Sequence, residues 1–209
     1  MLTVVCVLKS GGYYNAEWVD KLQRGVDRHM SVPHRFACLS DVPVNCFHIP
    51  LKHDWPAWWA KIELFRRGAI QTPALYLDLD TIITGSLDEL TDIDHDFAML
   101  RNFHDPTVVA SGVMWFRKVP HEVYKKFSGN AWSFIQYYQQ FKRGNHLGDQ
   151  AFIADTLDRD KIGFIENPRI KSYKKHCRES LPEDASLVCY HGAPRPWEIK
   201  TPWMREHWA

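Results

Sequence analysis

The sequence lacks an excess of charge of either sign. Its 209 residues include 26 basic and 25 acidic side chains, which gives a formal net charge of +1. A strongly basic chain would favour binding to a polyanion, and this balance removes that argument for the protein as a whole. Aromatic residues are plentiful, with nine Trp, eight Tyr and eleven Phe, and this composition excludes a disordered chain.

Cysteines are few, and their spacing matches neither a disulfide framework nor a zinc-binding motif. The five are an odd number and contain no C-x-x-C pair: Cys6, Cys38, Cys46, Cys177 and Cys189. This pattern argues against a disulfide scaffold and against a zinc clip, and it favours a reducing compartment. We therefore expect a cytoplasmic protein.

Long hydrophobic runs are also missing. The longest stretch without Asp, Glu, Lys or Arg is 127–141, which is too short and too polar to cross a bilayer. The apolar run at 2–8 has no basic residue before it and Lys9 directly after it. It therefore predicts a β-strand and not a signal peptide, and we expect no transmembrane segment.

Strand and helix patterns alternate along the chain. Strands are predicted at 3–8, 35–41, 44–49, 73–80, 96–101, 111–118, 161–166 and 185–191, and helices after Asn15 and at 57–68, 122–141 and 149–157. Such alternation predicts an α/β, Rossmann-like fold with a mostly parallel central sheet. The length suits one domain over 1–209, because neither a repeat nor a linker divides it.

Two aspartates, Asp78 and Asp80, end an apolar strand pattern. Residues two apart on an extended strand point to the same side, so both carboxylates would converge while Leu79 faces the core. Hard oxygen ligands at the carboxyl end of a parallel strand suit Mg²⁺ or Mn²⁺. Asp-x-Asp also occurs at 92/94, 94/96 and 158/160, but only the first pair follows a strand of buried type. The pair predicts a metal site; the alternative is a solvated turn.

The segment ALYLDLDTIITGSLDEL (74–90) resembles the D-x-D segment of the glycosyltransferase A fold. The resemblance is to glycosyltransferase family 8, in particular its glycogenin-like and bacterial galactosyltransferase-like members. Four further segments occur in the family's order: WWAKIELFR (58–66), SGVMWF (111–116), LGDQAFI (147–153) and HGAPRPW (191–197). The resemblance implies metal-dependent, retaining transfer of a sugar from a nucleotide-sugar donor, typically a UDP-sugar, to an acceptor hydroxyl.

The same resemblance implies roles for individual residues. Lys61 would lie near the donor, and Asp149 and Gln150 beside the donor sugar. Gly192 and Arg195 belong to the closing segment, where Arg195 takes the place of a family lysine and would bind phosphate oxygens bidentately. The alternatives are a surface lysine at 61, a loop charge at 195, and ordinary N-capping of the helix 149–157 by Asp149.

One departure from the family pattern concerns the third metal ligand. The family's usual histidine position is occupied here by Cys189, and the histidine nearby is His191. Positions 189 and 191 share one side of a strand, and a thiolate is a poor ligand for a hard cation. We therefore favour His191, together with Asp78 and Asp80, as the metal ligands. The alternative is a histidine hydrogen-bonded within the loop.

Residues after the first two strands occupy the place where such folds meet a nucleotide. Gly11 permits close approach of the backbone, Tyr13 can stack on a base, and Ser10 lies beside them. Asp41, after the second strand, can bind base or ribose. A tight turn at 10–13 and an ordinary Ser-Asp turn at 40–41 explain the same residues.

The strongest competing class is the haloacid-dehalogenase type of phosphatase, which would use Asp78 as its nucleophile. Its motif is hhhh-D-x-D-x-T, and LYLDLDTI is close to it. The threonine, however, is Thr81, directly after Asp80, whereas the motif requires it at the position of Ile82. A dinucleotide-dependent dehydrogenase is excluded because G-x-G-x-x-G is missing.

The acceptor is expected to be a saccharide. A basic segment, RIKSYKKHCR (169–178), keeps a nucleic-acid acceptor such as a hydroxylated DNA base open. The alternative is a solvated basic loop balanced by Glu179, Glu183 and Asp184. Oligomeric state carries no signal in the sequence.

Overall fold

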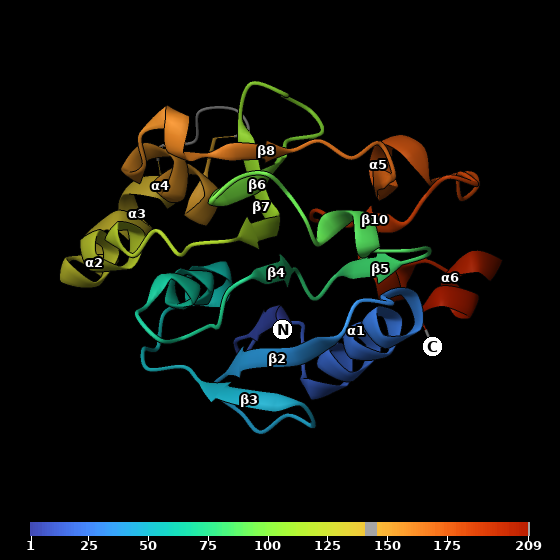
Figure 1. Cartoon of the computed structure of the whole chain (residues 1–209), viewed down its shortest axis with the longest axis horizontal. Helices are drawn as coiled ribbons and strands as arrows, with labels where there is room; N and C mark the ends of the chain where they lie inside the picture. The colour runs from blue at the N-terminus through green and yellow to red at the C-terminus, as the bar shows by residue number, and fades with distance from the viewer. Residues whose placement is uncertain (141–145, 209) are drawn as a thin grey trace.

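A seven-stranded sheet runs through the computed structural model, which describes residues 1–140 and 146–208. From one edge to the other its strands are β3 (Phe47–Pro50), β2 (His34–Ser40), β1 (Leu2–Leu8), β4 (Ala74–Leu77), β7 (Val109–Phe116), β6 (Phe97–Arg101) and β8 (Gly163–Ile165), from bottom to top in Figure 1. Within this sheet only the pairings of β7, with β4 and with β6, are antiparallel. This confirms the predicted α/β fold with a mostly parallel sheet.

Helices cover one face of this sheet. They are the 3₁₀ segment η1 (Ala57–Phe65) and the helices α2 (Glu122–Gly129), α3 (Ala131–Gln140) and α4 (Gly148–Thr156). Trp59, Phe127 and Phe152 fill the space between these helices and the strands, where Tyr76 and Met114 face them. In Figure 1, α2, α3 and α4 lie together to the left of β7, β6 and β8. This core fixes α4 next to β7, and η1 next to α4, α2 and β1.

The opposite face is covered by α1 (Ala16–His29) and a small second sheet. That sheet consists of β5 (Thr81–Ile83), β10 (Leu187–Cys189) and β9 (Ile170–Ser172), in the order β5-β10-β9. Ile83 and Leu187 pack with residues of α1 in one hydrophobic core. Ile82 and Val188 pack with Met204 in a separate hydrophobic cluster. The latter cluster includes the short helices α5 (Tyr173–His176) and α6 (Pro202–His207). The single-turn 3₁₀ segments are η2 (Asp88–Leu90), η3 (Arg159–Lys161) and η4 (Pro196–Glu198).

Local sequence explains most helix boundaries. The Asn15 side chain accepts a hydrogen bond from the Glu17 amide at 3.0 Å, as predicted for the N-cap of α1. The region predicted as one helix at 122–141 forms two helices, because Gly129 and Asn130 favour a break; Asn130 has an extended φ of −155°. The predicted end at Phe141 lies outside the described residues.

The segment predicted as an α-helix at 57–68 forms a 3₁₀ helix that ends at Phe65. Seven of its nine residues are buried, from Trp59 to Phe65, so it has no amphipathic stripe. A helix packed on all sides takes its geometry from its surroundings more than from its own periodicity. The correction matters for function because this segment carries Lys61.

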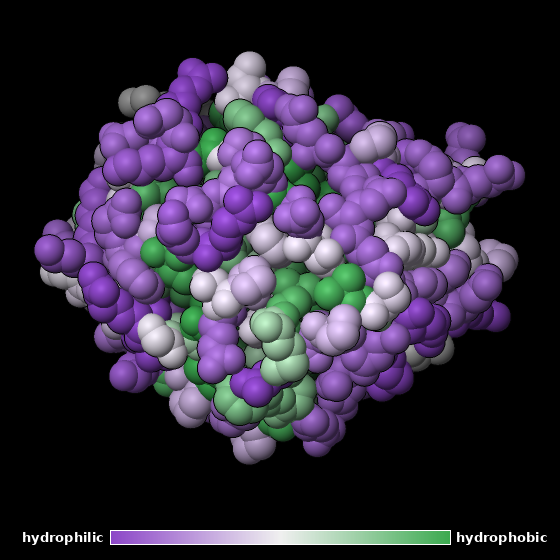
Figure 2. Space-filling view, in the orientation of Figure 1, coloured by the Kyte–Doolittle hydropathy of each residue, from purple (hydrophilic) through white to green (hydrophobic). Residues whose placement is uncertain are grey.

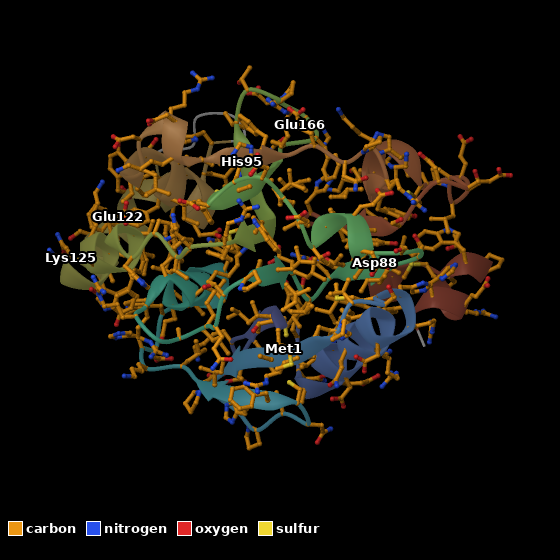
Figure 3. The ribbon with its side chains drawn as sticks, viewed as in Figure 1. Met1, Asp88, His95, Glu122, Lys125 and Glu166 are labelled. Atoms are coloured by element: carbon orange, nitrogen blue, oxygen red, sulfur yellow. The ribbon has the colours of Figure 1, made fainter. Side chains whose placement is uncertain are left out.

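The helices on the outside of the molecule are amphipathic. In α2, Val123 and Phe127 are buried, whereas Glu122 and Lys125 lie at the outer margin of the molecule in Figure 3. The face shown in Figure 2 is mostly hydrophilic at its margin, with hydrophobic residues visible toward the middle. Among the described residues, no helix has the length and apolar character that crossing a membrane requires.

Candidate functional site

The two predicted metal ligands lie in a turn directly after β4. The strand ends at Leu77, and Thr81 donates a backbone hydrogen bond to the Asp78 carbonyl at 3.1 Å. The prediction of a strand through residue 80 is therefore wrong. The chain turns here because β5 pairs with β10 in the second sheet and so leaves the first. The turn, and not strand alternation, brings the two carboxylates to the same edge.

Asp78 is held by two donors from the same side of the sheet. Its Oδ1 accepts hydrogen bonds from the Tyr76 hydroxyl at 2.5 Å and from Lys61 Nζ at 3.2 Å. Tyr76 is fully buried, and burial together with the charge of Asp78 raises the pKa of its hydroxyl well above the usual value. A neutral hydroxyl therefore remains as a fixed donor that orients this carboxylate.

Lys61 connects Asp78 to Asp149. Its ammonium lies 3.2 Å from Asp149 Oδ2 and donates to Ser111 Oγ at 2.9 Å. Burial opposes the charge, but the attraction of Asp149 and Asp78 outweighs it and raises the pKa of Lys61 above its usual value. Burial raises the pKa of Asp149, and the positive charge of Lys61 partly offsets this rise. The alternative of a surface lysine is thus wrong, because the Lys61 side chain is only 8% exposed.

Asp80 is held on the other side of the turn. Its Oδ2 accepts hydrogen bonds from the Tyr14 hydroxyl and from Arg195 Nη1, each at 2.7 Å. Burial, followed by repulsion from Asp78, raises the pKa of Asp80 to about 6. Two carboxylates therefore lie close enough to disfavour each other's charge, with Arg195 as a partial counter-ion.

A pocket of about 410 Å³ joins these groups at the carboxyl edge of the sheet. The sequence-predicted residues that line it are Lys61, Asp78, Asp80, Asp149, Gln150, His191, Gly192 and Arg195. The N-cap of α4 is Leu147, and Asp149 is the second residue inside the helix. The alternative in which Asp149 caps this helix is therefore wrong. The lining therefore contains three carboxylates and the two cations Lys61 and Arg195, which suits a ligand with both a charged and a hydroxylated part.

The paired aspartates fit a hard divalent cation. Among the described residues, Asp78 Oδ2 and Asp80 Oδ1 have no recorded hydrogen-bond donor, so each carboxylate keeps one oxygen for a ligand. A cation between them would relieve the repulsion that raises the pKa of Asp80. No group of three His, Cys, Asp or Glu side chains is assembled for a metal within residues 1–140 and 146–208. The carboxylates are therefore brought together, and a third ligand is not.

His191 lines the same pocket but faces a different set of side chains. Its Nε2 lies 2.6 Å from Ser172 Oγ, and its ring stacks on Phe103. Burial, and after it the charge of Lys174, lowers the pKa of His191 to about 4, so the ring is neutral at pH 7. Cys189 pairs with Thr81, directly after Asp80, and burial followed by the charges of Asp78 and Asp80 raises the pKa of its thiol well above the usual value.

The closing segment bends sharply after His191. Gly192 has a φ of +79°, a left-handed conformation that favours glycine. A Cβ at this position would lie 3.5 Å from Lys174 Nζ. The segment therefore passes beside a second cation before it reaches Arg195, whose guanidinium also lies over the rings of Tyr13 and Tyr14.

The residues predicted to meet the nucleotide are not part of the lining of this pocket. Asp41 accepts hydrogen bonds from the Ser10 amide at 2.8 Å and the Ser10 hydroxyl at 2.7 Å, and it pairs with Lys9. Burial opposes the charge of Asp41, but the bonds from Lys9 and Ser10 outweigh it and lower the pKa of Asp41. Gly11 has a φ of +83°, and Tyr13 is 75% exposed.

Two of the five Lys and Arg side chains of the basic segment 169–178 pair with acidic neighbours. Arg169 pairs with Glu89 at 3.3 Å, and Lys171 pairs with Asp184 at 2.7 Å. Lys175 donates to the Phe103 carbonyl. These contacts support the alternative of a balanced basic loop, and nothing here supports a nucleic-acid acceptor.

Sequence reasoning missed three residues that orient the charged groups. Tyr76 carried a signal, because it lies two positions before Asp78 on the same side of the chain. Ser111 lay within a recognised segment but was given no role. No feature of the sequence marked Tyr14, because its contact with Asp80 joins residues 66 positions apart.

No model of a known protein family matches the chain, and no curated protein sequence matches it either. Solved structures do. The glycosyltransferase GlyE of Streptococcus pneumoniae TIGR4 has a TM-score of 0.64 and 17% identity, covering 94% of this chain and 57% of its own. The galactosyltransferase LgtC, in complex with donor and acceptor sugar analogues, has a TM-score of 0.62 and 15% identity, covering 93% and 89%. The bifunctional glycosyltransferase WbbM has a TM-score of 0.60 and 13% identity, covering 98% and 50%.

These likenesses establish the fold. The chain has the glycosyltransferase A fold, in the form seen in GlyE, LgtC and WbbM, as the resemblance to family 8 implied. It spans little more than half of GlyE and about nine tenths of LgtC. At this level of identity the chemistry must be argued from the pocket itself.

Proposed function

We propose that the protein is a glycosyltransferase that moves a sugar from a nucleotide-sugar, typically a UDP-sugar, to a hydroxyl of a saccharide acceptor. The observation that carries this is the single pocket that combines Asp78, Asp80, Lys61, Asp149 and Arg195. The fold is that of known glycosyltransferases, and the LgtC structure holds donor and acceptor sugar analogues. The phosphatase alternative is not favoured, because Asp78 follows an inner strand and is already held by Lys61 and Tyr76.

The residues of the pocket divide into two groups by the part of the donor that they would contact. Asp78 and Asp80 would hold Mn²⁺ or Mg²⁺, which would screen the charge that develops on a departing diphosphate, and His191 would join them as the third ligand on leaving Ser172. Arg195 would add a planar cation for phosphate oxygens, and Ser10, Gly11, Tyr13 and Asp41 would contact the nucleoside. At the other end Asp149 and Gln150 would hold the hydroxyls of the donor sugar, with Lys61 fixing the position of Asp149.

Transfer would proceed with retention of configuration. In a front-face reaction, the bond from the acceptor oxygen to the anomeric carbon forms on the side from which the phosphate oxygen leaves. That phosphate oxygen takes the proton of the acceptor hydroxyl. No side chain is then required as a base, and Asp149, paired with Lys61, is free to stabilise positive charge on the sugar ring.

A thermal-shift experiment with a panel of nucleotide-sugars and Mn²⁺ tests this proposal. A ligand at a hundred times its dissociation constant stabilises by about 2.7 kcal/mol, or roughly 5–10 °C for a chain of this length. We expect one nucleotide-sugar to give this shift with Mn²⁺ and little without it. Asp78→Asn and Asp80→Asn should abolish the shift, whereas Asp92→Asn, in an exposed Asp-x-Asp pair, should keep it.

Slow hydrolysis of the same nucleotide-sugar should accompany binding. Cleavage of an aryl phosphate that is lost in Asp78→Asn would instead establish the phosphatase, and a protein that shifts with no nucleotide-sugar would contradict the proposal.

The third metal ligand is decided by a pair of variants. His191→Ala should weaken Mn²⁺ binding about tenfold or more in the presence of UDP, and Cys189→Ser should leave it unchanged, because a neutral buried thiol is a poor ligand for a hard cation. Isothermal titration with Mn²⁺ measures both. A loss in Cys189→Ser with full binding in His191→Ala would reverse the assignment.

A further inference from the structure

Two adjacent tryptophans in η1 have opposite environments. Trp59 is fully buried and stacks on Phe127 with ring centroids 5.3 Å apart, whereas Trp58 is 47% exposed. Burying a tryptophan is one of the larger hydrophobic gains open to a chain. About half of the Trp58 side chain remains in contact with water, so only part of this gain is obtained, and the residue lies at the pocket already described.

The backbone is also strained at this point. Ala57 has a φ of +50°, and it is the only residue other than glycine with a positive φ among residues 1–140 and 146–208. A non-glycine residue in this region costs about 1 kcal/mol or more, and such costs gather at binding sites. Strain and an exposed indole in consecutive residues indicate that the direction of Trp58 is specified.

Trp58 lines two adjoining hollows, which also share Leu147 and Gly148. On one side it lines the pocket with Lys61, Asp149 and Gln150. On the other it lines a hollow of about 180 Å³ with Tyr138, Gln139, Leu147 and Gly148. The second hollow lacks the residues that hold Asp80, so it lies beyond the sugar end of the pocket and not at the diphosphate end.

The indole is set close to the start of α4. Gly148 has a φ of +65°, and a Cβ there would come within 3.0 Å of Trp58 Nε1. Any other residue at 148 would displace the ring. Trp58 is 47% exposed, and among the described residues its Nε1 donates no hydrogen bond to the protein, which leaves this donor for a ligand.

We propose that Trp58 is the stacking platform for a pyranose ring of the acceptor saccharide. A pyranose has an apolar C–H face that suits an aromatic ring and a rim of hydroxyls that suits Nε1, Gln139 and Gln150. The platform would present an acceptor hydroxyl to the sugar held at Asp149. The inference rests on the proposed function and adds to it the chemistry that selects the acceptor.

Fluorine NMR of protein labelled with 5-fluorotryptophan tests this placement without turnover. Trp58→Phe identifies its resonance among the nine tryptophans, and Trp132, 61% exposed on α3, serves as the matched control. The probes are methyl β-galactoside and methyl β-lactoside, with glycerol as a polyol control, added to protein saturated with Mn²⁺ and UDP. We expect the Trp58 resonance to move and saturate with a glycoside, and that of Trp132 to stay.

Transfer kinetics give the second readout. Trp58→Ala should raise the KM for the glycoside acceptor about tenfold, with a smaller rise in Trp58→Phe, while the dissociation constant for UDP stays within about twofold. Trp132→Ala should change none of these values. A resonance that no glycoside moves, or an equal loss of UDP and glycoside binding in Trp58→Ala, would overturn the inference. Failure of the wild-type protein to bind any nucleotide-sugar would instead overturn the proposed function.

Discussion

Replacing Lys61 with methionine is expected to lower the free energy of unfolding by about 3–5 kcal/mol, since it removes one partner of a buried ion pair. Asp149 is only 7% exposed and would keep its charge without a counter-ion, whereas Asp78, at 30%, can still reach water. Burial already raises the pKa of Asp149, and without Lys61 the pKa rises further. When a carboxyl has a higher pKa in the folded state than in the unfolded state, the free energy of unfolding of the protein falls as the pH rises through that folded-state pKa. The deficit should therefore be larger at pH 8 than at pH 5, as measured by urea denaturation.

A double variant isolates the cause. Adding Asp149→Asn to Lys61→Met removes the unpaired charge and should recover stability to within about 1.5 kcal/mol of the wild type. Lys125→Met, on the exposed side of α2, is the matched control and should change stability by less than about 0.5 kcal/mol. If Lys61→Met behaved like Lys125→Met, the ion pair would contribute nothing to folding.

The parallel strands were predictable because each is a short apolar run bounded by turn residues. β1, β2 and β6 match their predicted ranges to within one or two residues. η1 was not predictable as a 3₁₀ helix, because residues buried on all sides leave no periodicity to read. The end of β4 was missed for a different reason: β5 leaves the sheet to pair with β10, more than a hundred positions away. Local pattern cannot contain such a contact.

The candidate site divides in the same way. Asp78 and Asp80 could be found because carboxylates directly after a buried strand are unusual. Lys61 and Asp149 were each marked by the resemblance, but their contact across 88 positions belongs to the fold. The contact of Arg195 with Asp80 was also not foreseen. Arg195 was expected at a phosphate, and in this structure it binds the carboxylate that is proposed to hold the metal.

This contact gives Arg195 opposite effects on two ligands. Replacing it with glutamine removes a cation 2.7 Å from Asp80 that repels any metal ion at the same carboxylate. Mn²⁺ alone should therefore bind Arg195→Gln about tenfold more tightly than the wild type, a change of about 1.4 kcal/mol. UDP with saturating Mn²⁺ should bind about a hundredfold more weakly, because the planar donors for phosphate oxygens are lost. Isothermal titration with each ligand in turn measures both effects.

Two further variants separate charge from position. Arg195→Lys keeps the charge near Asp80, so Mn²⁺ affinity should stay close to that of the wild type, while UDP affinity should fall because an ammonium cannot bind phosphate bidentately. Tyr14→Phe removes the hydroxyl that bonds to Asp80 and Arg195 without changing any charge, and should affect each ligand less than about fivefold. Weaker binding of both Mn²⁺ and UDP in Arg195→Gln would mean that the guanidinium serves only to position Asp80. Opposite changes would mean that the arginine must leave Asp80 for a phosphate when donor and metal bind together, which couples the two binding events through a single side chain.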